Sequence, residues 1–174
     1  VVPSEWKERW NELVSKYEEP QHLDFHYYME PLRVGAVSPL PKEEIKKKSP
    51  QEVVNYLHTW KPSRDPFAPS REALSGILSE VVSEDPSNYA KICYEFKTLQ
   101  HVYTYHLLEG FRKAVRKGNT FDWSPVIVLC RDVLATSESA EIQADEDRYY
   151  DLSTVKGAIA DLLEDCLLYT SPSP

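Results

Sequence analysis

The sequence predicts an all-α protein made of stacked antiparallel helix pairs, an α-solenoid-like arrangement. Along most of the chain, apolar residues recur every three or four positions, as they do on one face of an amphipathic helix. We find no stretch with the alternation of apolar and polar residues that is typical of a half-buried strand. A capping residue followed by proline also recurs at nearly equal intervals, at Ser49, Asp85 and Ser124.

These three marks indicate a repeat, because each opens a helix that is followed by a second helix before the next mark. Helix-pair repeats have periods of about 35 to 47 residues. Such pairs stack because a single pair cannot bury its own apolar face. The alternative is an irregular helical bundle in which prolines start helices without any repeat.

Residues 1–48 are expected to combine one helix with an irregular segment. Ser4 can cap a first helix whose apolar stripe runs from Trp6 to Tyr17. The proline- and aromatic-rich stretch EPQHLDFHYYMEPLRVGAVSPLP then shows no steady period. A short helical turn at 42–48 follows.

Residues 49–165 are expected to form three helix pairs, at about 49–84, 85–118 and 122–165. Ser49-Pro50-Gln51-Glu52 is a capping box with proline at the first helical position. The other expected boundaries are an N-cap at Ser70, a start at Asp85-Pro86, a left-handed C-cap at Gly118, a start at Asp122 to Pro125, and an N-cap at Ser153.

Composition argues against several classes of function. The net charge of −8 disfavours a general nucleic-acid or anionic-membrane surface, since both require a positive field. No apolar run reaches the length of a membrane span, so we expect no membrane partner. Cys93 and Cys130 lie in apolar stripes without CxxC spacing, which favours a reducing, cytoplasmic location. No nucleotide-binding motif or catalytic residue is recognisable, and we expect no cofactor.

His22, Asp24 and His26 form the most suggestive group for chemistry. Two imidazoles and a carboxylate within five residues are ligand types that hold divalent metals. The first histidine lacks the neighbouring glutamate of an HExxH motif, and the group follows a proline among bulky aromatics. Packed loop histidines are therefore the favoured interpretation, and a metal-dependent enzyme fragment is the alternative.

Two charged clusters are candidate interaction sites. Arg112, Lys113, Arg116 and Lys117 repeat at helical spacing and form a local positive ridge. Nucleic-acid binding through this ridge is a second alternative, which the overall negative charge makes unlikely. The acidic segment that contains Asp145, Glu146 and Asp147 is expected to be a solvated loop, with a docking surface for a basic partner as the sharper hypothesis.

The segments SPQEVVNYLHTWKPSRDPFAPSREAL, TFDWSPVIVLCRDVL and STVKGAIADLLED resemble a helical-repeat (HEAT/ARM-like) region of large, poorly characterised bacterial and archaeal multidomain proteins. The resemblance spans roughly residues 30–165. It implies a non-catalytic scaffold or protein-interaction segment of a longer chain, whose partners are other proteins or other domains of that chain. It brings no catalytic residues with it.

The last nine residues, CLLYTSPSP, resemble the in-frame translation of a sequencing adapter. They carry no charge and contrast with the charged, periodic sequence that ends at Asp165. We therefore expect 166–174 to be a non-native tail. The expectation that follows is that the chain is a fragment of a longer reading frame.

Overall fold

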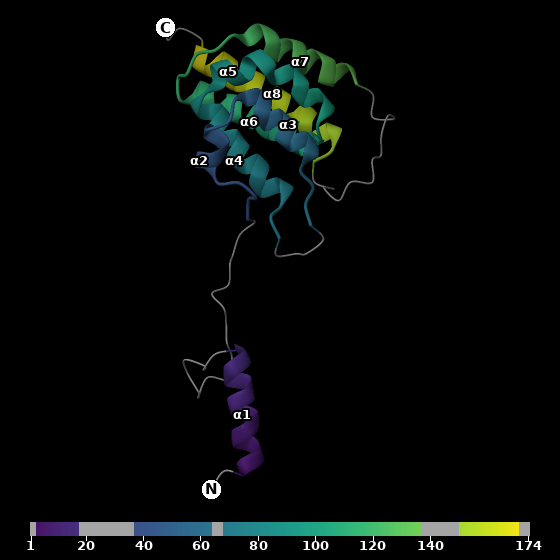
Figure 1. The fold of residues 1–174 in the computed structure, drawn as a ribbon. Coiled ribbons are helices and arrows are strands. Elements are labelled where there is room, and N and C mark those ends of the chain that lie inside the picture. Colours follow the sequence, from purple (N-terminus) through teal and green to yellow (C-terminus); the bar gives the residue numbers. More distant parts are fainter. Residues whose placement is uncertain (1–2, 18–36, 64–67, 137–149, 171–174) are drawn as a thin grey trace. The chain divides into compact units, whose positions relative to one another are not determined.

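The computed structural model of the chain describes residues 3–17, 37–63, 68–136 and 150–170 (Figure 1). It divides into two compact units, Val1–Gly35 and Ala36–Pro174. The described residues are helical, with no strand among them, so the all-α prediction is confirmed for this part of the chain. The elements are α1 (Ser4–Tyr17), α2 (Lys42–Lys46), α3 (Pro50–Thr59), α4 (Arg71–Glu84), α5 (Pro86–Ile92), the 3₁₀ helix η1 (Cys93–Thr98), α6 (His101–Arg116), α7 (Trp123–Ala135) and α8 (Leu152–Thr170).

Helix α1 is the described element of the first unit. Its apolar stripe is exposed, with Trp6 at 72% and Trp10 at 41% of their full accessible surface. None of its residues is buried. The helix begins at Ser4 itself, so Ser4 is helical and does not precede the helix as a cap.

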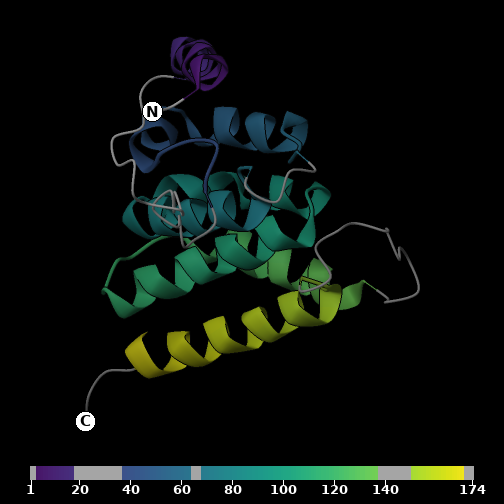
Figure 2. The same ribbon diagram turned by 90° about the horizontal axis from the view of Figure 1, so that it is seen from below.

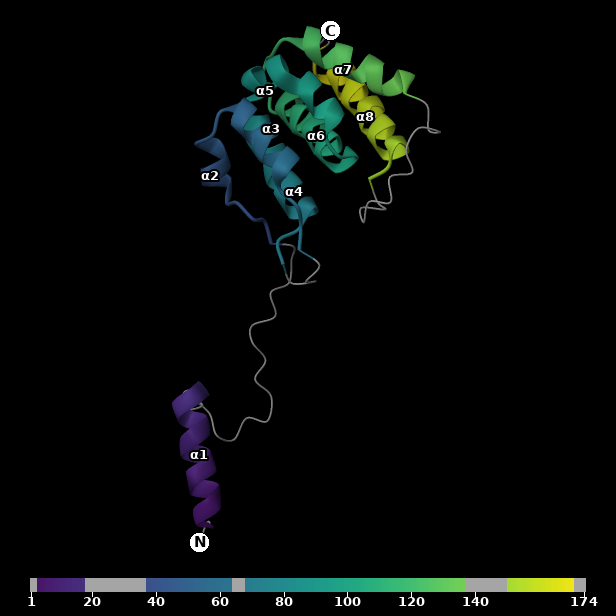
Figure 3. The same cartoon turned by 45° about the vertical axis from the view of Figure 1, so that its right-hand side comes forward.

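The second unit places helices two apart in sequence side by side. Helix α2 contacts α4, α4 contacts α6, and α6 contacts α8, which forms one row. A second row runs from α3 to α5 to α7, with η1 also against α7. Figure 2 shows the order from the blue helices α2 and α3 to the yellow α8, and Figure 3 shows α4, α6 and α8 as neighbours.

The core lies between the two rows. Helix α6 is the central element, since nine of its sixteen residues are buried. Its Leu107 and Phe111 are fully enclosed, as are Leu78 of α4 and Leu129 of α7. Each such large apolar side chain contributes about 1.5–3 kcal/mol when it leaves water.

Local signals explain most helix ends. The capping box at Ser49 is present: its Oγ accepts a hydrogen bond from the Glu52 amide at 3.3 Å, and the Glu52 carboxylate accepts one from the Ser49 amide at 2.7 Å. Gly118 adopts a φ of 77° after α6. Its amide and that of Asn119 donate to carbonyls in the last turn of α6, which completes a Schellman motif.

The expected start at Asp85-Pro86 is confirmed, whereas the caps expected at Ser124 and Ser153 are wrong. Asp85 precedes α5 but its side chain makes no capping hydrogen bond. Asp122, and not Ser124, caps α7, because its carboxylate accepts from the Ser124 amide at 2.9 Å. Helix α8 begins at Leu152, ahead of Ser153, and the Asp151 carboxylate accepts from the Thr154 amide at 2.7 Å.

Candidate interaction face

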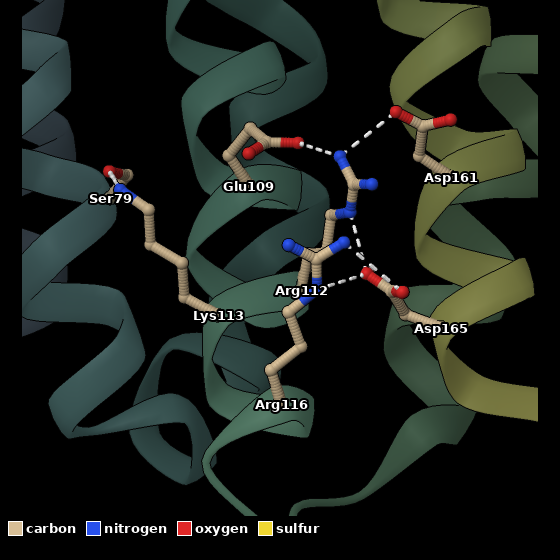
Figure 4. Close-up of polar contacts among 7 residues, drawn as sticks. All are labelled: Ser79, Glu109, Arg112, Lys113, Arg116, Asp161 and Asp165. Atoms are coloured by element: carbon tan, nitrogen blue, oxygen red, sulfur yellow. Dashed lines mark hydrogen bonds and ion pairs between the residues drawn. The ribbon is translucent and has the colours of Figure 1, made fainter. Parts of the chain in front are cut away.

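The four basic residues predicted as a ridge lie on the side of α6 that faces away from the core. Their side chains divide into two pairs, and Figure 4 draws three of the four, Arg112, Lys113 and Arg116. Arg112 and Arg116 reach toward α8, whereas Lys113 reaches toward α4. Lys117, one turn after Lys113, also reaches toward α4. The two arginines therefore contact α8, and the two lysines, each one residue further along the chain, contact α4.

The two arginines share a single carboxylate, that of Asp165. Arg112 Nε donates to Asp165 Oδ2 at 2.6 Å, and Arg116 Nε donates to the same oxygen at 2.7 Å. Arg116 also reaches Asp165 Oδ1 at 3.2 Å. The Arg112 guanidinium in addition binds Glu109 at 3.1 Å and Asp161 at 2.9 Å. This cluster joins α6 to α8.

Asp165 is the enclosed member of the cluster, with only 7% of its side chain exposed. Burial by itself would raise its pKa, but the hydrogen bonds and charges of Arg116 and Arg112 outweigh burial and hold the pKa below its ordinary value. The hydrogen bond to Asp165 likewise raises the pKa of Arg112. The carboxylate is therefore ionised at neutral pH and neutralised by its neighbours.

The lysines meet neutral oxygens instead. Lys113 Nζ donates to Ser79 Oγ at 2.8 Å, and Lys117 Nζ donates to Ser83 Oγ at 3.0 Å. Both serines lie on α4, where each hydroxyl donates back to a carbonyl three residues earlier. Within the described ranges, neither ammonium group has a carboxylate at ion-pair distance.

A third set of contacts lies between α2 and α4. Lys42 Nζ lies 3.0 Å from a Glu80 oxygen and 2.7 Å from a Glu84 oxygen. Lys46 Nζ lies 2.9 Å from Glu84. Hydrogen bonds from Lys42 and Lys46 lower the pKa of Glu84 to about 2. Of the cations that link the four helices of this row, Lys113 and Lys117 thus stand out as bonded to hydroxyls.

From its spacing to His101, His106 is expected to be a surface or half-buried residue and not part of a ligand pair. It is half-buried on α6, and its ring lies edge-on to Tyr105 and 5.6 Å from the Tyr150 ring. Its buried Nε2 has no hydrogen-bond partner among the described residues. Burial, with a smaller effect from the charge of Lys113, lowers its pKa to about 4. It is therefore a neutral packing residue at pH 7.

The two stripe cysteines are enclosed as their positions predict. Cys93 and Cys130 are buried and carry free thiols. Burial raises the pKa of Cys93 to about 12 and that of Cys130 to about 11. The thiolate that nucleophilic chemistry requires is therefore strongly disfavoured at both positions.

The other predicted site residues are not placed. His22, Asp24 and His26, and likewise Asp145, Glu146 and Asp147, lie outside the described residues. Among the residues that are described, no group of three or more histidine, cysteine, aspartate or glutamate side chains is arranged to hold a metal ion. The same part of the chain contains no helix with the length and apolarity needed to cross a membrane.

Comparison of the chain with models of protein families, with curated proteins and with solved structures gives no match.

Proposed function

We propose that residues 36–165 form an α-solenoid-like scaffold that binds a protein partner through the outer face of α4, α6 and α8. The order of the contacts supports the repeat interpretation, because helices two apart in sequence are neighbours in both rows. Stacked helix pairs have this connectivity, and they offer an extended surface to partners. The cytoplasm is the compartment that we propose for this activity.

The observation that carries the proposal is the pair of lysines bonded to serine hydroxyls. Among the described residues, Lys42 and Lys46 of α2 and the two arginines of α6 face carboxylates across the row. Lys113 and Lys117 instead donate to neutral hydroxyl oxygens. An acidic protein segment would supply the missing counter-charges. It would also gain specificity, because misplaced cations or apolar groups could not pair there.

A protein partner is favoured over nucleic acid by the surrounding charges. Glu109, Asp161 and Asp165 pair with Arg112 and Arg116 on the α8 side of α6, so these two arginines are already balanced and only the lysine pair of this face is left to bind a phosphate backbone. A discrete acidic side chain can approach the two ammonium groups and avoid these carboxylates. Nucleic-acid binding and the metal-dependent alternative at His22, Asp24 and His26 remain the competing hypotheses.

The test is a binding titration at low ionic strength, followed by fluorescence anisotropy. Two labelled probes are used: a glutamate-rich helical peptide and a single-stranded DNA. We expect Lys113→Gln/Lys117→Gln to weaken peptide binding at least tenfold. The matched control, Lys48→Gln/Lys91→Gln, removes the same charge from other parts of the unit and should leave binding within twofold of the parent.

Two results would overturn the proposal. Peptide binding that falls equally in both double variants would reduce the effect to net charge. Stronger binding of DNA than of peptide, lost in Lys113→Gln/Lys117→Gln, would assign the face to nucleic acid.

A further inference from the structure

The two lysines of the α6 face are tied to buried serines. Lys113 and Lys117 are exposed residues, yet the Nζ of Lys113 donates to Ser79 Oγ and the Nζ of Lys117 donates to Ser83 Oγ. Each serine is only 1% exposed. A lysine side chain in water samples many rotamers, so a hydrogen bond to a buried oxygen restricts the position of its charge.

The serine hydroxyls have a fixed orientation. Ser79 Oγ donates to the Gly76 carbonyl at 2.9 Å, and Ser83 Oγ donates to the Glu80 carbonyl at 2.7 Å. Because a hydroxyl has a single hydrogen, each oxygen can only accept from its lysine. An ammonium group has three N–H donors, and among the described residues the serine is the acceptor that each lysine uses. The remaining donors are available to a ligand.

The serines themselves are held close to α6. A Cβ at Gly110 would lie 2.9 Å from the Ser79 carbonyl oxygen, so the backbones of α4 and α6 approach closely at this point. After the end of α6, Asn119 Nδ2 donates to the Ser83 carbonyl at 3.0 Å. Helix packing therefore fixes both serine oxygens relative to α6, and through them the two ammonium groups.

The two serine–lysine pairs repeat at the same interval. Ser79 and Ser83 lie four residues apart on α4, and Lys113 and Lys117 lie four residues apart on α6. Four residues of an α-helix advance about 6 Å along its axis. A partner that binds both ammonium groups must therefore present two carboxylates at about this separation.

We infer that the lysine pair selects an α-helical partner segment with two acidic residues four positions apart, and that Ser79 and Ser83 are the positioning residues that set this selectivity. The inference rests on the proposed function, because it specifies the partner of the same face. Acidic residues four apart lie on one side of a helix, whereas residues two apart do not. A helix also satisfies its own backbone hydrogen bonds, so it can bind a face whose serine hydroxyls are already bonded.

Three labelled peptides of identical composition test the inference by fluorescence anisotropy with the full chain at low ionic strength. Each has an alanine-rich sequence with two glutamates and one proline. The first peptide has the glutamates four residues apart, the second has them two residues apart, and in both the proline begins the helix. The third keeps the spacing of four but has the proline between the glutamates, where it breaks the helix. We expect the first peptide to bind about tenfold more tightly than either of the others.

Serine variants separate the position of the charges from their number. Ser79→Ala/Ser83→Ala keeps both lysines, and because alanine favours helix, circular dichroism should show unchanged helix content. We expect its preference for the first peptide to fall to within about twofold. The matched control is Ser75→Ala, since Ser75 is also buried on α4 and donates to the Glu72 carbonyl at 3.0 Å, whereas its hydroxyl is not one of the two that bind a lysine. This control should keep the full preference.

The outcomes distinguish the inference from the proposed function. Equal binding of the three peptides, still weakened by Lys113→Gln/Lys117→Gln, would overturn the inference and leave the proposed function standing. A preference that survives in Ser79→Ala/Ser83→Ala, or that is lost in Ser75→Ala, would show that the two serines do not position the lysines. Absence of binding, or binding that Lys113→Gln/Lys117→Gln does not weaken, would refute the proposed function and the inference with it.

Discussion

Helix α6 meets α4 through small side chains and α8 through charged ones. On the α4 side, a side chain at Gly110 would place its Cβ 2.6 Å from Val82 Cβ and 2.9 Å from the Ser79 carbonyl oxygen, so the two backbones approach closely. On the α8 side, Arg112 and Arg116 span the gap to Asp165 with long side chains. The contact between α4 and α6 therefore depends on the small volume of the side chain at position 110. The contact between α6 and α8 depends on ion pairs.

The difference has a physical consequence. A junction of close-packed backbones is insensitive to pH and salt but cannot accept added atoms. A junction of long, flexible ion pairs can adjust to added volume, but it loses its attraction when one partner is neutralised. We expect changes at the two junctions to be separable in experiment.

Gly110→Ala should have the largest effect. The added methyl meets Val82 and a backbone oxygen, neither of which is a flexible side-chain end, so α4 and α6 must separate. We expect a loss of about 3 kcal/mol in the free energy of unfolding, despite the better helix propensity of alanine. Urea denaturation measures it.

Gly76→Ala is the control for the glycine change, because nothing lies within 4 Å of a Cβ at that position of α4. It should stabilise the chain by up to about 1 kcal/mol. A Gly110→Ala chain as stable as Gly76→Ala would mean that the two helices are not in close contact.

Asp165→Ala should have the next largest effect. It leaves two guanidinium groups facing each other without their shared carboxylate. Arg112 keeps Glu109 and Asp161, and Arg116 is half exposed, so we expect a loss of about 2 kcal/mol, less than for a fully buried pair. The double variant Asp165→Ala/Arg116→Ala should recover part of the loss. Equal losses in the single and the double variant, by urea denaturation, would contradict a direct interaction.

Acid should weaken the α8 junction before the α4 junction. The pKa of Asp165 is lowered in the folded chain, so its stabilisation is complete above the ordinary aspartate value near 3.9 and is lost as the pH falls through the lower folded value. Amide hydrogen exchange at decreasing pH should show faster opening of α8 than of α4. Faster opening of α4 than of α8 would contradict this prediction.

His106 should add a separate pH dependence at higher pH. Its pKa is lowered from 6.5 to about 4 in the folded chain, so the unfolded chain takes up a proton first. Stability should therefore fall as the pH decreases from about 6.5 toward 4. His106→Phe, which keeps a ring against Tyr105 and Tyr150, should flatten this part of the stability profile and leave the fall below pH 4. An unchanged profile would show that His106 is not enclosed.

Lys113→Gln/Lys117→Gln should have the smallest effect on stability. Each lysine contributes a hydrogen bond to a serine that is already bonded to a backbone carbonyl. We expect a change of less than about 1 kcal/mol in the free energy of unfolding by urea denaturation. A larger loss would mean that the two lysines, and not only close packing, hold α4 and α6 together.

The helices and their order could be predicted from sequence because the signals are local. The capping box at Ser49 and the glycine at position 118 act within one turn, and apolar periodicity identifies the buried face of α4, α6 and α7. Competing caps defeated the prediction at Ser124 and Ser153. Both helices begin before the expected serine, and the carboxylates of Asp122 and Asp151 accept hydrogen bonds from amides of the first turn.

The basic residues of the α6 face were also predicted from their spacing, but their partners were not. Asp165 lies 49 residues from Arg116, and Ser79 lies 34 residues from Lys113, so these pairs exist only because of how the helices stack. The half-buried position of His106 agrees with the sequence, but its contact with the distant Tyr150 ring could not be predicted. Ser79 and Ser83 are spaced four residues apart, as are Lys113 and Lys117. This matching spacing was the sequence feature that could have indicated the serine–lysine pairs.

The hydrogen bonds of the two lysines show the relative direction of α4 and α6. Ser79 pairs with Lys113 and Ser83 with Lys117, so α4 and α6 run parallel and their C-terminal turns lie at the same end of the row. Parallel helix dipoles do not cancel, and the partial negative charges of two carbonyl ends add in one place. The ammonium group of Lys117 lies near the C-terminal ends of both helices, and its positive charge offsets the partial negative charges of both. The backbone itself therefore constrains the sign of charge that this surface can carry: a glutamate at position 117 would be opposed by two helices at once.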